Sequence, residues 1–196
     1  MTAPTHIVTG LATVVVVGRV TGVTPDAVSL MAVIFGSLAP DIDGTGVITR
    51  PGTILRQIIG RGPANLLDAV FEFIAAAVHF FFGHRGFVHS PLLAFGIFGL
   101  GGYLGKPWLE WFGIGYAAHL LGDAMTTGGI PLWNPFSSKR ASLSDMRTGS
   151  RTEYAVAVGL LLFTCVFGWG LLPEKVKDMH QMIYEKLSAS QSQPPT

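Results

Sequence analysis

Six long apolar segments, separated by short polar or glycine- and proline-containing stretches, dominate this sequence and restrict what it can fold into. They cover residues 7–20, 25–38, 66–82, 91–104, 108–125 and 154–172. Charged residues make up only 13% of the chain, whereas a soluble domain carries about 25%. So few charges cannot cover a water-facing surface, and the high apolar content also argues against disorder. We therefore predict an all-α, polytopic membrane bundle rather than a soluble enzyme.

Proline and helix-capping residues mark where several of these helices start. Two N-cap residues are followed directly by proline, at Thr24-Pro25 and Ser90-Pro91. Ser150 and Glu153 have the spacing of a capping box at the start of the last apolar helix. Residues 50–61 are typical of a basic, glycine-containing loop, and residues 127–149 of a polar loop. Trp108 and Trp111 are placed as interfacial anchors.

Segment 66–82 differs from the others because it carries Asp68 and Glu72 one turn apart. That pattern favours a helix at the membrane interface, or packed on protein, over a lipid-exposed span. Segment 7–20 is short, since a spanning helix needs about 20 residues. We expect about five transmembrane helices plus one interfacial helix. Residues 1–175 would form one membrane-embedded domain, and residues 176–196 an amphipathic and then disordered tail.

Ionisable residues beside or inside the apolar segments are the best candidates for a functional site. If segment 66–82 does not cross the membrane, one side collects seven of them: His6, Asp41, Asp43, His84, His89, His119 and Asp123. If that segment crosses, the 41–43 and 84–89 groups lie on opposite faces. Their convergence therefore depends on the path of this one helix.

The chemistry of these residues indicates a metal site. His119 and Asp123 are four residues apart, so both project from one helix face. Imidazole suits zinc, copper, iron or nickel, while carboxylates shift the preference toward harder cations such as manganese. Asp41 and Asp43 could bridge two cations, or supply a ligand and a general base. Cys165 is the only cysteine, which excludes an intramolecular disulfide and a cysteine-rich zinc module.

Simpler explanations exist for each of these residues. His119 and Asp123 could form a structural hydrogen bond, although two ionisable groups deep in an apolar helix are costly unless paired or functional. His79 is more simply a core histidine. Glu153 is either a capping-box partner or, less simply, a ligand. His6 could merely begin the first helix at the interface.

Basic residues are distributed unevenly between the two sides of the proposed topology. Eight arginines and lysines lie on the site side and five on the other, three of these in the C-terminal tail. Because basic residues collect on the cytoplasmic side of short loops, we place the site near the cytoplasmic face and the C-terminus outside. The formal charge of +1 predicts no broad nucleic-acid surface.

The ordered set of motifs resembles a known family. The motifs are Thr-His at 5–6, Ala-Pro-Asp-Ile-Asp at 39–43, His-Arg-Gly-Phe-Val-His-Ser at 84–90, the segment from His-Leu-Leu-Gly-Asp to Asn-Pro-Phe-Ser at 119–137, and Arg-Thr-Gly-Ser with Glu at 147–153. Together they are similar to the YdjM-type family of bacterial and archaeal membrane proteins, which is described as metal-dependent hydrolases distantly related to zinc-dependent phospholipase C. The resemblance extends from Thr5 to about residue 172. Val88 departs from the small or hydroxyl residue usual before the second histidine.

The resemblance implies both a ligand set and an activity. Metal ligands are expected at Asp41, Asp43, His84, His89, His119 and Asp123, with His6 as a further member. Arg85 would orient the substrate, and Asp41 or Asp43 would act as base. Thr126 would hydrogen-bond to a metal ligand without binding the metal itself. The cofactor would be one or two divalent metals, zinc first or manganese. We expect an inner-membrane hydrolase acting on an ester or phosphoester of a lipid or lipid-linked substrate.

Two other functions stay open at this stage. A metal-ion transporter would use the same ligands as a transit site and would continue a polar path to the far side. A non-catalytic regulatory or structural protein would hold a closed metal centre, saturated by protein ligands. Membrane lipids are the expected partners in every case, and the oligomeric state is not predicted.

Overall fold

Helices and the turns between them build the chain in a computed structural model, which describes residues 1–43, 50–82 and 86–171. Within these residues the only β-type pairings are two isolated bridges. The predicted all-α class is therefore confirmed. The helices are α1 Ala3–Thr21, α2 Ala27–Gly36, α3 Pro51–Ile59, α4 Arg61–Phe82, α5 Pro91–Leu104, α6 Pro107–Ala124 and α7 Arg151–Gly168. Three short 3₁₀ turns accompany them: η1 Ala39–Asp43, η2 Phe87–His89 and η3 Trp169–Leu171.

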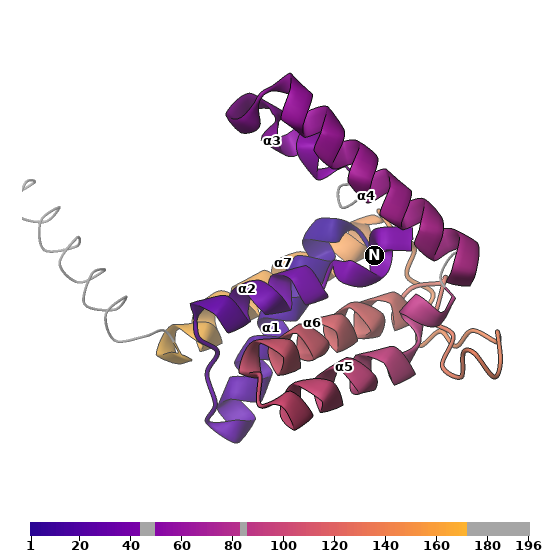
Figure 1. The fold of residues 1–196 in the computed structure, drawn as a ribbon. Helices are drawn as coiled ribbons and strands as arrows, with labels where there is room; N and C mark the ends of the chain where they lie inside the picture. The colour runs from indigo at the N-terminus through magenta and orange to yellow at the C-terminus, as the bar shows by residue number, and fades with distance from the viewer. Residues whose placement is uncertain (44–49, 83–85, 172–196) are drawn as a thin grey trace, which may run out of the picture.

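Helix α6 is the centre of the main bundle. It packs against α1, α2 and α5, while α7 packs on the outer side of α1. Figure 1 shows these five helices lying side by side, with α3 and α4 extending away from them. Val14, Val33 and Trp111 form a buried cluster between α1, α2 and α6. The candidate metal ligands of α6, His119 and Asp123, are thus enclosed by neighbouring helices on several sides.

Glycine lets α2 and α6 approach closely. A Cβ atom at Gly36 would lie 2.2 Å from the carbonyl oxygen of Phe112, and one at Gly115 would lie 2.2 Å from that of Val33. Backbone contacts this close are possible only where side chains are absent, as in many membrane helix pairs. The crossing brings the C-terminal end of α2, and η1 after it, to the last turns of α6.

Two of the predicted helix starts can be compared with the observed caps. Ser90 caps α5 as expected, since its side-chain oxygen accepts a hydrogen bond from the Leu92 backbone N–H at 3.3 Å. The prediction at Thr24-Pro25 is wrong, because α2 begins two residues later. There the Asp26 carboxylate accepts from the Ser29 N–H at 2.7 Å, and a carboxylate also suits the positive end of a helix.

The expected loop at residues 50–61 is also wrong, because Pro51–Ile59 forms helix α3. This helix is stabilised by packing on α4 rather than by its own apolar content. The Asp68 carboxylate accepts from the Thr53 backbone N–H and hydroxyl at 3.2 and 3.0 Å. Arg50 pairs with Glu72 at 2.7 Å. The two acidic groups of α4 therefore face α3, instead of forming an unpaired wet surface.

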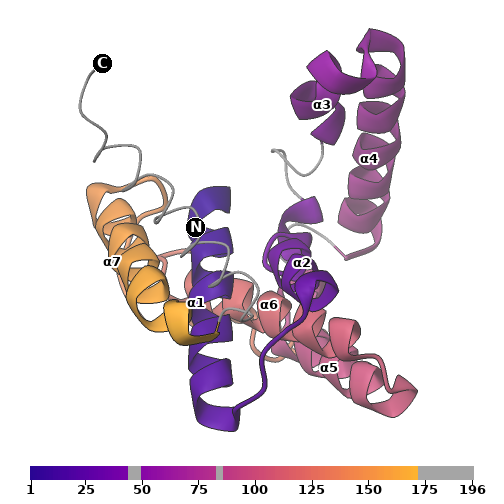
Figure 2. The same ribbon diagram turned by 90° about the vertical axis from the view of Figure 1, so that its left-hand side faces the viewer.

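Helix α4 lies outside the main bundle, paired with α3, and contacts η1. Figure 2 shows α3 and α4 as a separate pair, away from α5 and α6. His89 of η2, which follows α4 in the chain, lies beside Asp41 of η1. The predicted convergence of Asp41 and His89 is observed, but the condition that α4 does not cross the membrane stays a prediction. Whether α4 lies at the interface stays a prediction.

Three described helices are long and apolar enough to cross a membrane: Ala3–Thr21, Arg61–Phe81 and Arg151–Leu171. The first helix is longer than the 14 residues that the sequence suggested, because it starts at Ala3, with Pro4 in its first turn. Helices α2 and α5, with 10 and 14 residues, are apolar but shorter. The total of five crossings stays a prediction, as does the division at residue 175. The proposed tail lies outside the described residues.

Two smaller predictions fail because of tertiary packing. Trp111 is only 5% exposed and belongs to the core, so it is not an interfacial anchor, whereas Trp108 is 45% exposed at the start of α6. His79 lies on the exposed surface of α4 rather than in a core. Helix periodicity could not show which faces of α4 and α6 have neighbours.

Candidate metal centre

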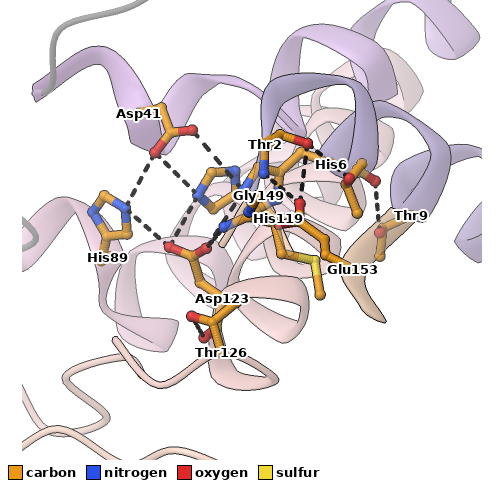
Figure 3. A network of polar contacts seen from close by, with 12 residues as sticks. Thr2, His6, Thr9, Asp41, His89, His119, Asp123, Thr126, Gly149 and Glu153 are labelled. Atoms are coloured by element: carbon orange, nitrogen blue, oxygen red, sulfur yellow. Dashed lines mark hydrogen bonds and ion pairs between the residues drawn. The ribbon is translucent and has the colours of Figure 1, made fainter. Parts of the chain in front are cut away.

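Four elements that are distant in sequence meet at one point near the end of α6. Asp41 comes from η1, His89 from η2, His119 and Asp123 from α6, and His6 from α1. Figure 3 shows the five side chains directed toward a common centre. The structure thus brings together five of the seven predicted ligands. The side chain of Asp43 and the whole of His84 and Arg85 lie outside the described residues.

Local backbone structure places these side chains. Asp41 sits in the 3₁₀ turn that follows α2, where its N–H donates to the Leu38 carbonyl at 3.1 Å. The His89 N–H donates to the Gly86 carbonyl at 3.0 Å, immediately before the Ser90 cap of α5. Proline at 40 and at 91 restricts the backbone beside each ligand.

The His119 ring is oriented by a backbone acceptor. Its Nδ1 lies 2.8 Å from the carbonyl oxygen of Ser37, to which Nδ1–H donates. That hydrogen bond leaves Nε2 unprotonated and directed toward the carboxylates. Histidine ligands of metals are commonly held in this way, with one ring nitrogen on a carbonyl and the other on the metal.

Four donor atoms are spaced with unusual regularity. His89 Nε2 lies 3.8 Å from Asp41 Oδ1 and 3.7 Å from Asp123 Oδ2, while His119 Nε2 lies 3.7 Å from each of the same two oxygens. One ligand atom from each of the four residues falls within 4.8 Å of all the others. These separations exceed the roughly 2.7–3.2 Å of a good N–H···O hydrogen bond.

The donor set fits a divalent cation. Zinc bonds of about 2.0–2.2 Å in a tetrahedral site put neighbouring ligand atoms about 3.3–3.6 Å apart. The observed separations are only slightly longer. His119 Nε2 is buried and has no hydrogen-bond partner among the described residues, an arrangement that costs free energy unless a cation completes it. The cluster of Asp41, His89, His119 and Asp123 can therefore hold a metal ion.

The second oxygens of the two carboxylates face His6. Its Nε2 lies 3.4 Å from Asp123 Oδ1 and 3.9 Å from Asp41 Oδ2. The His6 ring stacks on the His119 ring, with centroids 3.6 Å apart and planes 13° from parallel. Neither His6 nitrogen has a hydrogen-bond partner among the described residues. The amino nitrogen of Met1 also lies on this side, 2.5 Å from Asp123 Oδ1.

Among the five described residues of the cluster, Asp41 is the partly exposed one. The three histidines and Asp123 are fully buried, but the Asp41 side chain is 33% exposed. Burial acts to raise the pKa of Asp41, yet the neighbouring imidazoles of His89, His119 and His6 hold it below its ordinary value. Asp41 is thus a carboxylate at neutral pH and lies at the open edge of the site.

Thr126 takes a different position from the one expected. Its hydroxyl donates to the Asp123 backbone carbonyl at 2.8 Å, not to a ligand side chain. The contact closes the last turn of α6, where carbonyl groups otherwise lack partners. Thr126 therefore fixes the helix end that carries Asp123, a less direct form of support than the sequence suggested.

Glu153 is a residue whose structural role the sequence did not reveal. Only half of the capping box forms, since the Ser150 side chain accepts from the Glu153 N–H at 3.3 Å. The fully buried carboxylate accepts instead from the Thr2 N–H at 2.6 Å, the Thr2 hydroxyl at 3.0 Å and the Gly149 N–H at 2.6 Å. Glu153 thus joins the starts of α1 and α7. Its partner Thr2 lies four residues before His6 in α1. The capping-box spacing predicted only the local partner, Ser150, and not the distant partner, Thr2.

We expect Glu153→Gln to destabilise the protein by about 1–3 kcal/mol, because an amide cannot accept all of these hydrogen bonds and leaves buried donors unsatisfied. Thermal unfolding in detergent measures the loss. Glu72→Gln is the control, since Glu72 forms an exposed ion pair on α4 and such pairs contribute little. Equal melting temperatures for the two variants would contradict this role of Glu153.

Comparison with known proteins places the chain in a family. The family described as "YdjM inner membrane protein" matches residues 1–176. The "Uncharacterized protein YvsG" of Bacillus subtilis (strain 168) is 31% identical over 169 residues, which cover 85% of this chain and 94% of that protein. The "Inner membrane protein YdjM" of Escherichia coli (strain K12) is 26% identical over 110 residues, covering 52% and 56%. No solved structure matches.

These matches confirm the resemblance that the motifs predicted, and the apolar helices agree with the membrane location in the family's description. A relationship to hydrolases stays a prediction. The chain belongs to the YdjM inner membrane protein family.

Proposed function

We propose that this protein is a membrane-bound, metal-dependent hydrolase that cleaves an ester or phosphoester of a lipid or lipid-linked substrate. The observation that carries the proposal is the buried His/Asp cluster with one partly exposed carboxylate, Asp41. A catalytic metal site keeps an open position, whereas a structural one is saturated by protein ligands. Exposure at Asp41 supports the open arrangement.

We propose zinc as the metal, with manganese as the alternative, and two ions rather than one. One group of donors comprises His89, His119 and one oxygen from each of Asp41 and Asp123. The other oxygens of the two carboxylates face His6. Two carboxylates that each offer one oxygen to either side are suited to bridging a pair of cations. Asp43 and His84 remain proposed ligands on the basis of the family resemblance.

The chain's own residues would supply positioning and proton transfer. A divalent cation at such a site supplies Lewis acidity and lowers the pKa of water toward about 7. Asp41, at the solvent edge, would accept the proton released by the attacking water where one of its oxygens is left without a cation. The N-terminus of α5, directly after His89 and Ser90, would attract an anionic group of the substrate. Arg85 is a proposed partner of the same group, and Asp43 is the other candidate base.

A lipid substrate is supported by the surroundings of the site. An apolar groove of about 300 Å³ lies between α5, α6 and the following loop. Its lining includes Leu120 and Ala124, which each follow a proposed ligand on α6, and Pro91, which comes two residues after His89. A chain of a lipid could occupy such a groove while its headgroup reaches Asp41. We also propose that the protein is multi-pass and that the site lies near the cytoplasmic face.

The test uses purified protein reconstituted in vesicles of mixed bacterial phospholipids. We expect zinc-loaded protein to release water-soluble headgroups or fatty acids, and both a chelator and Asp41→Asn to abolish release. The absence of any release from metal-loaded protein would contradict the hydrolase proposal. Uptake of zinc into the same vesicles, without hydrolysis, would favour the transporter.

A further inference from the structure

The loop between α6 and α7 exposes large apolar side chains, although most of its sequence is polar. Four of its large apolar side chains point outward, with exposed fractions of 40% for Leu132, 66% for Trp133, 85% for Phe136 and 70% for Leu143. We name these four residues the apolar tip. Clusters of exposed aromatic and aliphatic side chains mark contact sites for proteins or membranes.

Backbone hydrogen bonds hold the loop in one shape. Ile130 and Ala141 exchange two of them, at 3.0 and 2.9 Å, and the Leu143 N–H donates to the Ala124 carbonyl at 2.7 Å. The Ser90 hydroxyl donates to the Asn134 carbonyl at 2.9 Å. The apolar tip is thus fixed relative to α6 and to the residue that follows His89. In Figure 1 the loop, in orange, extends beyond the C-terminal end of α6.

The charges of the loop indicate what kind of surface the apolar tip contacts. The same loop carries exposed cations at Lys139, Arg140 and Arg147, against a single acid, Asp145. Aromatic side chains mixed with lysine and arginine are typical of the boundary between lipid headgroups and acyl chains. Cations at this depth attract anionic headgroups.

Aromatic residues also mark the opposite end of α6. Trp108 is 45% exposed at its start, and Tyr103 is 86% exposed at the end of the neighbouring helix α5. The 18 residues of α6 measure about 27 Å at about 1.5 Å per residue. The hydrocarbon core of a bilayer is about 30 Å thick. Trp108 and the end of α6 from which the loop emerges are therefore separated by about the thickness of one bilayer core.

We propose that the apolar tip inserts into the headgroup–acyl boundary of a bilayer containing anionic lipids and holds the metal centre at headgroup level. Contact between tip and lipid does not require hydrolysis, so this inference is independent of the proposed function.

The test measures the depth of a spin label in the full chain reconstituted in anionic vesicles of phosphatidylglycerol and phosphatidylcholine. Cys165, which is exposed, is first replaced in a Cys165→Ser background. A nitroxide is then attached at Phe136→Cys in one variant and at Thr24→Cys in the other. Thr24 is an exposed polar residue of the loop between α1 and α2, so it reports the aqueous side. The readouts are collisions with lipid-soluble oxygen and with a water-soluble nickel complex.

We expect the label at 136 to collide mainly with oxygen and to lose most of the nickel accessibility measured at 24. In vesicles of phosphatidylcholine alone, nickel accessibility at 136 should rise, since the cations lose their anionic partners. Nickel accessibility at 136 equal to that at 24 would overturn the proposal. Spin–spin broadening at 136 would assign the tip to a second copy of this chain instead, and no change between the two lipid mixtures would remove the role of anionic lipid.

Discussion

His119→Ala and Asp41→Asn should each lower the metal content of the purified protein at least about tenfold. Residues that only support a ligand already change metal affinity by about 10–100-fold, and these two residues contribute donor atoms themselves. His119 also connects the site to the Ser37 carbonyl. The measurement is elemental analysis of protein purified in detergent and dialysed against trace zinc.

The two variants differ in their structural risk. His119→Ala removes a buried ring, whereas Asp41→Asn keeps the size of a side chain that is 33% exposed. Asp41→Asn should therefore fold normally, as shown by its helical circular dichroism. His79→Ala is the matched control, because His79 is an exposed histidine on α4. Normal metal content in a folded Asp41→Asn protein and in His119→Ala would contradict the ligand assignment.

Gly115→Ala should be among the most damaging single-methyl changes in the bundle. The added Cβ would lie 2.2 Å from the Val33 carbonyl oxygen, which is helix backbone and cannot rotate away. Overpacking of this kind costs about 1–3 kcal/mol and occasionally more. Helix α2 would have to move away from α6. Its end carries the Ser37 carbonyl that orients His119, so we expect metal content to fall together with stability.

Gly99→Ala is the control for that experiment. Gly99 lies in helix α5, and a Cβ there would meet nothing within 4 Å. Alanine is the better helix former by about 1 kcal/mol, so this variant should melt at or above the wild-type temperature. Thermal unfolding in detergent, followed by elemental analysis, compares the two glycines. If both variants melted alike, the close crossing of α2 and α6 would not be a determinant of the site.

Much of the fold was predictable because apolar helices and their caps are local features. Ser90 and the proline after it marked the start of α5, and α6 was predicted to within one residue at each end. Helix α3 was missed because it is held by packing on α4, including the contact of Thr53 with Asp68, and no local pattern reveals such packing. Asp26 was missed as the cap of α2 because an equally good cap-and-proline pair precedes it.

A topological argument predicted that five of the candidate ligands would come together, but it did not predict their geometry. The order of the apolar segments predicted that Asp41 and His89 would meet if the segment between them returned to the same side. No sequence pattern could show that Asp41 and Asp123 each direct one oxygen toward His6 and the other toward His119. Nor could spacing reveal Glu153 as the partner of Thr2, since 151 residues separate them.

X-ray absorption spectroscopy of the zinc-loaded protein tests the central claim most directly, namely that imidazole and carboxylate side chains from separate helices share a cation. The account predicts nitrogen and oxygen ligands at about 2.0–2.2 Å, with no sulfur. It also predicts the outer-shell scattering of at least two imidazole rings per zinc, and a loss of part of that scattering in His89→Gln. A spectrum of oxygen ligands alone, without imidazole scattering, would contradict it.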